Sequence, residues 1–186
     1  MQNSHVVDKA KENKKAYVFE SILDWLQSAV IALIVVALVY SVLFRVVNVS
    51  GDSMTNTLQS GEKLVLSGII LQPNYGDIVV IQRENDTPLI KRVIGLPGDT
   101  IFINDSNGIV YRNGEALDEP YVRGGFTPSK GLNTEYVVPE DGIFALGDNR
   151  DNSLDSRMLR DRLKMRDVVG VVICRLNPLE SLRNGE

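Results

Sequence analysis

The sequence predicts a mainly β domain that follows one N-terminal membrane-spanning helix. The first observation is residues 25–44, a run of 20 residues without a charge. A helix of that length, at about 1.5 Å per residue, spans the roughly 30 Å of hydrocarbon in a bilayer. The second observation is that short runs rich in β-branched residues recur between turn residues through the rest of the chain. Within a chain of 186 residues, the part after the helix is long enough for one domain.

We expect a retained membrane anchor over residues 25–45. The uncharged run is longer than the roughly 7–15 residue core of a secretion signal, and no small-residue cleavage site follows it. Four lysines lie between residues 9 and 15, whereas the first residues after the run carry few basic side chains, which favours a cytoplasmic N-terminus. Residues 1–24 are therefore expected to form a cytoplasmic tail, and residues 46–186 an extracytoplasmic domain.

Seven apolar runs predict the strands of this domain. They are Lys63 to Leu66, Asp77 to Gln82, Leu89 to Ile94, Thr100 to Ile103, Ile109 to Arg112, Ile143 to Leu146 and Val168 to Cys174. Asn113-Gly114 is typical of a two-residue hairpin turn. Residues 115–138 show little periodicity and are expected to form a long loop that leaves the main sheet.

Charge and composition exclude several classes of function. Residues 46–186 carry 15 Lys and Arg against 20 Asp and Glu, and this acidic balance argues against nucleic-acid binding. Cys174 is the single cysteine, so an internal disulfide is excluded, and its apolar surroundings predict a buried strand residue. His5 is the only histidine and lies in the tail.

The segment Ser50 to Leu58 contains a candidate nucleophile, Ser53, although a Ser/Thr/Gly-rich segment is by itself more typical of a turn. A serine hydroxyl attacks only when a positioned base removes its proton, and that base is usually histidine. Because His5 would lie across the membrane, a lysine kept neutral by burial is the main remaining option.

The domain has four lysines, namely Lys63, Lys91, Lys130 and Lys164. Lys91 is the best candidate base, because the alternation of a strand places it on one face with Leu89 and Val93. An apolar face of that kind favours the neutral amine. The alternative interpretation is that Lys91 and Arg92 are charges on a solvated edge strand.

The third polar segment, Gly147 to Arg157, directly follows a predicted strand. A solvated loop would explain its composition equally well. Its three aspartates suggest a metal site only weakly, because no histidine or cysteine joins them and the neighbouring arginines would compete for the carboxylates.

In this order the three segments resemble the boxes of bacterial type I signal peptidases. The family patterns are S-G-x-S-M-x-P-T-L, K-R-x-x-G-x-P-G-D and G-D-N-R-x-x-S-x-D-S-R, and the second and third match from Lys91 and from Gly147 without exception. The segment Gly76 to Val80 is similar to the family's G-D-I-V-V strand. The resemblance extends from the membrane span to about Cys174.

The resemblance implies a Ser/Lys dyad with Ser53 as nucleophile and Lys91 as general base. It also implies that Ser153 bonds to Lys91 and orients it, and that the backbone N–H of Ser53 stabilises the oxyanion. Further supporting residues implied by the third box are Asp148, Asp155 and Arg157. Neither a cofactor nor a metal is expected.

The resemblance further implies a signal-peptidase-like antiparallel β-sheet catalytic domain. The implied activity is the removal of signal peptides from secreted precursors, which would be bound extended, with small residues at the first and third positions before the cut. The expected partners are such precursors and the lipid bilayer, and the expected location is the plasma membrane of a bacterium, in single-pass topology.

The chain departs from the family pattern at two positions. Asn56 replaces the proline of the first box, and Arg160 stands where a glycine is usual. Gly51 matches the pattern, but some members carry a hydroxyl there that could serve the oxyanion, and the second oxyanion donor is therefore left open. The alternative hypothesis is a catalytically impaired, membrane-anchored β-domain that binds or presents secreted chains. A soluble Ser/Lys protease with a DNA-binding region fits less well, because the chain has an anchor and an acidic domain. A domain in reversed topology is a further alternative.

Overall fold

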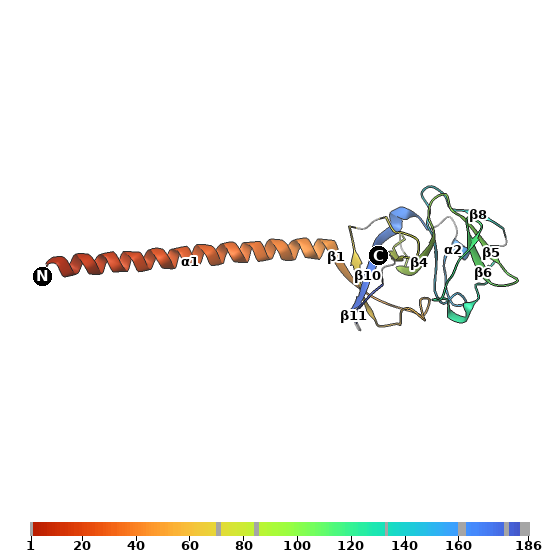
Figure 1. Ribbon diagram of the computed structural model, residues 1–186, viewed down its shortest axis with the longest axis horizontal. Helices are drawn as coiled ribbons and strands as arrows, with labels where there is room; N and C mark the ends of the chain where they lie inside the picture. The colour runs from red at the N-terminus through yellow and green to blue at the C-terminus, as the bar shows by residue number, and fades with distance from the viewer. Residues whose placement is uncertain are drawn as a thin grey trace. The chain divides into compact units, whose positions relative to one another are not determined.

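The computed structural model describes residues 2–69, 72–83, 86–132, 134–159, 163–176 and 179–182 (Figure 1). The chain divides into two compact units, residues 1–42 and residues 43–186. The first unit is helical and the second contains the strands. Arg160 and Arg162, singled out in the sequence, lie outside the described residues.

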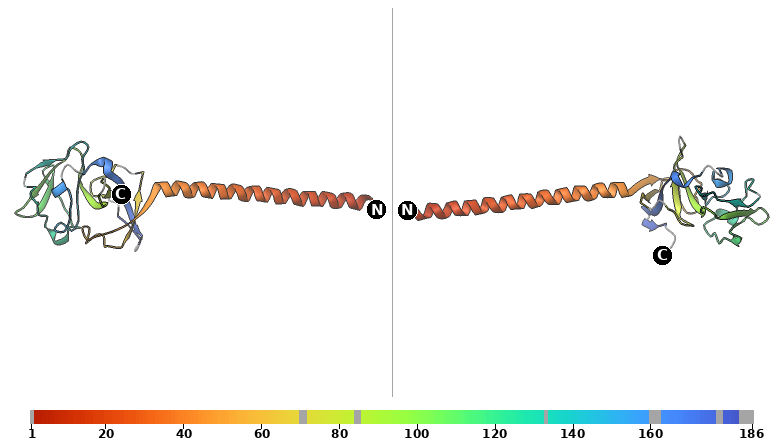
Figure 2. Two further views of the ribbon diagram at one scale, coloured as in Figure 1. Left: turned by 180° about the vertical axis from the view of Figure 1, so that it is seen from behind. Right: turned by 90° about the horizontal axis from the view of Figure 1, so that it is seen from above.

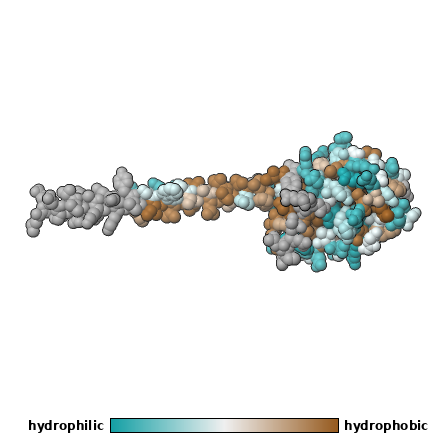
Figure 3. Space-filling model, in the orientation of Figure 1, coloured by the Kyte–Doolittle hydropathy of each residue, from teal (hydrophilic) through white to brown (hydrophobic). Residues whose placement is uncertain are grey.

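The helical unit is formed by α1, which spans Gln2–Leu43. Its segment Phe19–Ser41 has 23 residues and a mean hydropathy of 2.3, so its length and composition are sufficient to cross a membrane. Apolar side chains predominate along this part of the helix (Figure 3). The helix thus also includes the expected tail, and it ends two residues before the expected end of the span at residue 45, because Phe44 begins a strand.

The larger sheet is antiparallel and has the strand order β1-β2-β10-β3-β4-β9, with β11 paired to β10. Its strands are β1 (Phe44–Asn48), β2 (Lys63–Ser67), β3 (Ile78–Ile81), β4 (Leu89–Gly95), β9 (Phe144–Leu146), β10 (Val168–Leu176) and β11 (Leu179–Ser181). The strand β4 lies between β3 and β9, so it is not an edge strand.

The smaller sheet is antiparallel, with the order β7-β6-β5-β8. Its strands are β5 (Thr100–Asn104), β6 (Ile109–Arg112), β7 (Glu115–Ala116) and β8 (Tyr136–Val137). In two views, β5, β6 and β8 lie at the opposite end of the strand-containing unit from β1, β10 and β11 (Figures 1 and 2). Asn113 and Gly114, with φ of 53° and 83°, form the turn between β6 and β7, which confirms the predicted hairpin.

The prediction of a mainly β, antiparallel domain is confirmed. Each of the seven predicted runs contains a strand, and the bounds differ by at most two residues at either end. The predicted excursion, residues 115–138, is largely irregular, but its two ends pair with the smaller sheet as β7 and β8. Two short helical turns, η1 (Arg123–Gly125) and η3 (Met165–Asp167), and the helix α2 (Ser156–Leu159) complete the described elements.

Two apolar clusters of the larger sheet support the polar segments. One cluster contains Met54 and Leu58 packed with residues of β2, β3 and β10. The other contains Val93, on the face of β4 that the alternation assigns to Lys91, and Val79, the residue of β3 that pairs with Lys91. Both clusters exclude water beneath the segments that carry the candidate dyad.

Candidate active site

Ser53 lies in the loop of residues 49–62 between β1 and β2. The backbone N–H groups of Thr57 and Leu58 both donate to the carbonyl of Met54, over 3.0 and 2.8 Å, so the loop folds into a turn just after the serine. Met54 and Leu58 are buried in the core, whereas Ser53 is half-buried. The apolar side chains therefore anchor the turn and leave the hydroxyl group of Ser53 accessible.

The segment that follows β9 holds the backbone on both sides of this serine. The backbone N–H of Asn149 donates to the carbonyl of Ser53, and its Nδ2 donates to the carbonyl of Asp52, each over 3.0 Å. A methyl group at Gly147 would overlap the Ser53 carbonyl oxygen and the Ser153 hydroxyl, so only glycine fits there. The role of Asn149 was not predicted, although it lies within a matched motif.

Lys91 reaches Ser53 from β4. Its amine donates to Ser53 Oγ over 2.7 Å and to the carbonyl of Ile90 over 2.9 Å. Lys91 is only 2% exposed and its neighbour across the sheet is the fully buried Val79. The interpretation of Lys91 and Arg92 as charges on a solvated edge strand is therefore wrong.

Burial lowers the pKa of Lys91 from 10.5 to about 8. Removal from water disfavours the ammonium form and is the largest cause. The charges of Asp155 and Asp148 oppose this effect, and that of Arg157 adds to it. At pH 7 about a tenth of the amine is therefore neutral and able to accept a proton, far more than for an unperturbed lysine, and this is the direction that the apolar face of β4 predicted.

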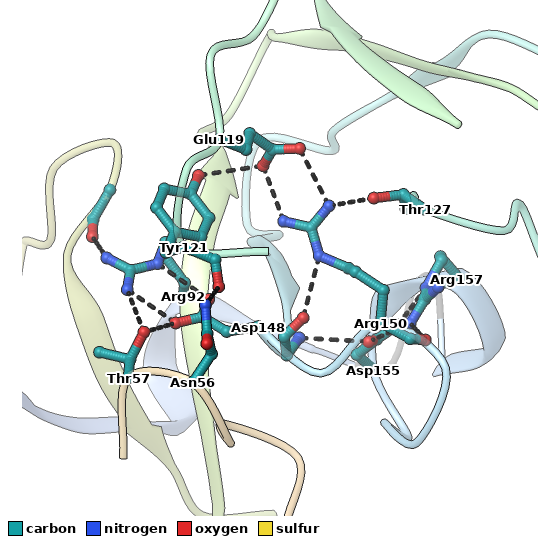
Figure 4. Close-up of polar contacts among 12 residues, drawn as sticks. Asn56, Thr57, Arg92, Glu119, Tyr121, Thr127, Asp148, Arg150, Asp155 and Arg157 are labelled. Carbon is teal, nitrogen blue, oxygen red and sulfur yellow. Dashed lines mark hydrogen bonds and ion pairs between the residues drawn. The ribbon is translucent and has the colours of Figure 1, made fainter. Parts of the chain in front are cut away.

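Three buried arginines each pair with a carboxylate of their own. The pairs are Arg92 with Asp148, Arg150 with Glu119, and Arg157 with Asp155, all with a closest distance of 2.7 Å (Figure 4). No carboxylate in the described part of the chain lies within ion-pair distance of Lys91. The arginines thus occupy the carboxylates that would otherwise hold Lys91 in its charged form.

Asp148 joins the loop of Ser53 to β4. It accepts Nε and Nη2 of Arg92 over 2.9 and 2.7 Å, and it also accepts the hydroxyl of Thr57. Arg92 donates in addition to the carbonyl of Gly76. Thr57 is a further residue that sequence reasoning missed, because a hydroxyl in a turn-like segment gives no distinctive signal.

Asp155 and Arg157 form a bidentate pair with no exposed surface on either side chain. Burial would raise the pKa of Asp155, but the hydrogen bonds and charge of Arg157 outweigh burial and the pKa is lowered. Asp155 also accepts the N–H of Gly147, and Arg157 donates to the carbonyl of Pro128. The pair therefore links the segment after β9 to the excursion.

Ser153 lies at the site but its predicted bond to Lys91 stays a prediction. Its hydroxyl is buried beside Gly147 and has no hydrogen-bond partner of good geometry among the described residues. The same hydroxyl nevertheless lies close enough to Asp155 to contribute to lowering the pKa of that carboxyl group. Lys130, from the excursion, donates to the carbonyl of Ser153 over 3.0 Å and fixes its backbone.

The weak suggestion of a metal site in the third polar segment finds no support in the described residues. Among them, no group of three or more His, Cys, Asp or Glu side chains is arranged to hold a metal ion.

Asn56 stands at the position of the family's proline. It has a φ of 107°, which a proline ring, fixed near −65°, cannot adopt. The local backbone thus differs from the one that a proline would impose.

The site brings together a serine hydroxyl, a buried lysine amine and a backbone N–H without a partner among the described residues. A neutral amine 2.7 Å from a serine oxygen is within reach for proton transfer. None of the groups that the structure describes accepts the backbone N–H of Ser53. That N–H is therefore free to bind a developing negative charge.

Comparisons with known proteins identify relatives of this chain. Residues 22–176 match the family model "Signal peptidase, peptidase S26". Signal peptidase I P of Bacillus subtilis subsp. natto is 36% identical and the match covers 96% of this chain and 99% of that protein. Signal peptidase I S of Bacillus subtilis is 36% identical over 74% of this chain and 79% of that protein. A crystal structure of a signal peptidase I from Enterococcus faecalis has 30% identity and a TM-score of 0.41, covering 54% of this chain and 96% of that chain.

These matches define the class of protein as a peptide-bond hydrolase. The chain belongs to the signal peptidase family, peptidase S26.

Proposed function

We propose that this protein removes signal peptides from secreted precursors, with Ser53 as nucleophile and Lys91 as general base. The observation that carries the proposal is the 2.7 Å hydrogen bond between the two side chains, made by an amine whose pKa burial lowers to about 8. The substrate class is supported by the relatives, which are named signal peptidases.

The reaction is acyl transfer in two stages. Neutral Lys91 takes the proton of Ser53 while Oγ attacks the scissile carbonyl carbon, and the backbone N–H of Ser53 binds the oxyanion. The C–N bond then breaks, and the leaving amine takes the proton from the Lys91 ammonium group. In the second stage Lys91 takes a proton from a water molecule as its oxygen attacks the acyl carbon of the ester. The bond between that carbon and Oγ of Ser53 then breaks, and the Lys91 ammonium group returns the proton to Oγ.

The remaining site residues support this dyad in the proposal. Asp148 and Asp155 place negative charge near Lys91 and limit how far its pKa falls. Arg157 neutralises Asp155, and Ser153 is proposed to orient the amine during turnover. No step needs a cofactor or a metal.

We also propose the membrane arrangement of the chain. Residues 1–24 form the cytoplasmic tail, residues 25–45 the span, and residues 46–186 the extracytoplasmic catalytic domain at a bacterial plasma membrane. The apolar segment Phe19–Ser41 and the lysines that precede it support this arrangement. The precursor and the bilayer are then the partners of the enzyme.

Cleavage of a purified precursor with a small-x-small site tests the activity. The native chain in detergent or lipid is compared with Ser53→Ala and Lys91→Ala, and each variant is first shown to be folded by circular dichroism. We expect cleavage by the native chain and a loss of at least about 10³-fold in both variants. If the folded native chain binds the precursor without cutting it, the protein is instead a binding module.

Cysteine accessibility tests the topology. In a Cys174→Ser background, a single cysteine is placed at the exposed residue Gln59 and labelled in intact cells with a membrane-impermeant maleimide. Labelling before lysis supports an extracytoplasmic domain, whereas labelling only after lysis supports the reversed topology.

A further inference from the structure

Asn56 has an unusual backbone conformation three residues after Ser53. Its φ is 107°, and the only other non-glycine residues with positive φ in the described chain are Asn113 and Lys130. Left-handed conformations cost roughly 1–2 kcal/mol for residues with a Cβ atom, although asparagine tolerates them better than most. The surrounding structure must therefore stabilise this conformation.

A hydrogen bond to the excursion provides part of this stabilisation. Nδ2 of Asn56 donates to the carbonyl of Tyr121 over 3.0 Å. Tyr121 is itself fixed, because its ring stacks on the guanidinium of Arg92 at 3.9 Å and its hydroxyl donates to Glu119 (Figure 4). The acceptor carbonyl is thus held by contacts that do not involve the loop of Ser53.

The same arginine holds the next residue of the loop by a second route. Arg92 pairs with Asp148, and Asp148 accepts the hydroxyl of Thr57. Asn56 is therefore attached to Arg92 through Tyr121. Thr57 is attached through Asp148 and by a direct bond of 3.4 Å from Nη2 of Arg92 to its hydroxyl (Figure 4). Two attachments at consecutive residues restrict rotation of the loop as well as its displacement.

Because Arg92 is the neighbour of Lys91 in β4, these attachments also affect the distance between Ser53 and Lys91. Arg92 follows Lys91 in β4, which is an interior strand of the larger sheet. One residue of β4 contacts Ser53 directly, and the adjacent residue holds the loop that carries Ser53. The distance between hydroxyl and amine is consequently set by neighbouring positions of a single rigid element.

We propose that Asn56 is a positioning residue that, with Tyr121, clamps the Ser53 loop to the strand carrying Lys91. The effect of this clamp on catalysis rests on the proposed function. Its effect on the mobility of the Ser53 loop does not require any activity. In relatives that match the family pattern a proline ring constrains this position, whereas here the side chain of Asn56 does so through a carbonyl of the excursion. Asn56 itself touches neither substrate nor the reacting atoms in this proposal.

Two substitutions remove the hydrogen bond between Asn56 and the carbonyl of Tyr121 in different ways. Asn56→Gly keeps access to positive φ but deletes the donor, and Asn56→Asp keeps the shape but places a carboxylate against the Tyr121 carbonyl. Asn113→Gly is the matched control, because Asn113 also has a positive φ and its Nδ2 also donates to a distant segment, in this case to Asp99 before β5. Its hairpin lies in the smaller sheet and contains no site residue.

Steady-state kinetics test the effect on catalysis. Because a displaced nucleophile affects the chemical step, we expect kcat to fall about tenfold in both Asn56 variants. KM should change by less than about twofold, and the pH at half-maximal rate should stay in place, because Lys91 remains buried. The proposal is overturned if kcat of the Asn56 variants equals that of Asn113→Gly, or if the loss lies in KM alone.

Amide hydrogen exchange tests the clamp without substrate. The N–H groups of Thr57 and Leu58, bonded to Met54, should exchange faster in both Asn56 variants and at the native rate in Asn113→Gly. Tyr121→Phe keeps ring and carbonyl and should leave this exchange near the native rate, whereas Tyr121→Ala should accelerate it. Unchanged exchange in Asn56→Gly contradicts the clamp. A native chain that cuts no precursor contradicts the proposed function, and the exchange rates still decide whether the clamp exists.

Discussion

The amine of Lys91 lies 2.7 Å from Oγ of Ser53, although Lys91 is only 2% exposed and has no carboxylate of its own within ion-pair distance in the described structure. A buried lysine without a counter-ion loses the hydration of its ammonium form and becomes easier to deprotonate. The same burial that makes the amine a base therefore imposes a cost on the folded state. Activity and stability should depend on the ionisation of this one group.

The rate of cleavage should rise with pH through the pKa of Lys91. Only the neutral amine accepts the proton of Ser53, so the neutral fraction, and with it kcat/KM, increases up to about pH 8 and then levels off. Below that point the rate should fall about tenfold per pH unit. Initial rates between pH 5 and 10, with a substrate that has no group titrating in this range, measure the profile. A rate that is flat from pH 5 to 8 contradicts the role of Lys91.

Lys91→Met should abolish cleavage and stabilise the folded protein. The pKa of Lys91 is about 8 in the folded protein and 10.5 in the unfolded chain, so the unfolded state binds more protons between these pH values. Above about pH 10.5 Lys91 is neutral in both states and does not reduce the free energy of unfolding. As the pH falls from 10.5 to about 8, burial of this amine lowers the free energy of unfolding progressively, and below about pH 8 the reduction is complete. Methionine removes that loss, and we expect the free energy of unfolding to rise by about 1–3 kcal/mol at pH 7.

Denaturant unfolding of the two proteins at pH 7 and pH 10 measures this effect. The gain from Lys91→Met should shrink at pH 10, because other ionising groups are common to both proteins and cancel in the difference. A gain that is equal at both pH values, or a loss at pH 7, would show that the buried amine does not reduce stability.

Asp155→Asn should move the activity profile to lower pH and destabilise the fold. The carboxylate of Asp155 raises the pKa of Lys91, so its removal lowers that pKa further. It also leaves the fully buried guanidinium of Arg157 unpaired, which costs about 3–5 kcal/mol. Asp99→Asn, which removes the partner of Arg112 instead, is the control and should leave the profile in place. A profile that stays fixed or moves to higher pH in folded Asp155→Asn contradicts the proposed electrostatic link.

The sequence predicted the parts of this site that depend on local pattern. Alternation along β4 was sufficient to place Lys91 on an apolar face, and the turn residues Asn113-Gly114 were sufficient to predict a hairpin. The short strands β7 and β8 could not be predicted, because two-residue strands carry no periodicity and form only when a neighbouring strand offers partners. Contacts between distant segments were equally inaccessible, because a hydroxyl such as Thr57 shows no sequence signal for the carboxylate it meets.

Asn149 and Tyr121 illustrate the same limit. The backbone and side chain of Asn149 hold the carbonyls of Ser53 and Asp52, yet composition alone assigned its segment equally well to a solvated loop. Tyr121 lies in the excursion, for which the sequence predicted only an irregular loop. Both residues act through long-range packing, and their roles follow from the three-dimensional structure rather than from the order of residues.

Gly147→Ala should abolish activity with only a moderate loss of stability. The added methyl group would overlap the Ser53 carbonyl on one side and the Ser153 hydroxyl on the other, so the Ser53 loop must move away from the segment after β9. Because a displacement near 1 Å already costs about 10²-fold in rate, we expect kcat to fall at least that far. The loss of stability should be about 1–3 kcal/mol, typical of a methyl group inserted into a packed site.

Gly142→Ala is the matched control for this substitution. A methyl group at Gly142 would meet Pro139 at 3.0 Å, so the variant also crowds a buried glycine, in this case with a partner outside the site. We expect a loss of stability without a loss of kcat. Cleavage assays and thermal unfolding of both variants distinguish the cases, because crowding alone would lower stability in both proteins and kcat in neither. If Gly147→Ala retains native kcat, the close approach of Ser53, Gly147 and Ser153 is not required for the reaction, and the segment after β9 does not position the nucleophile.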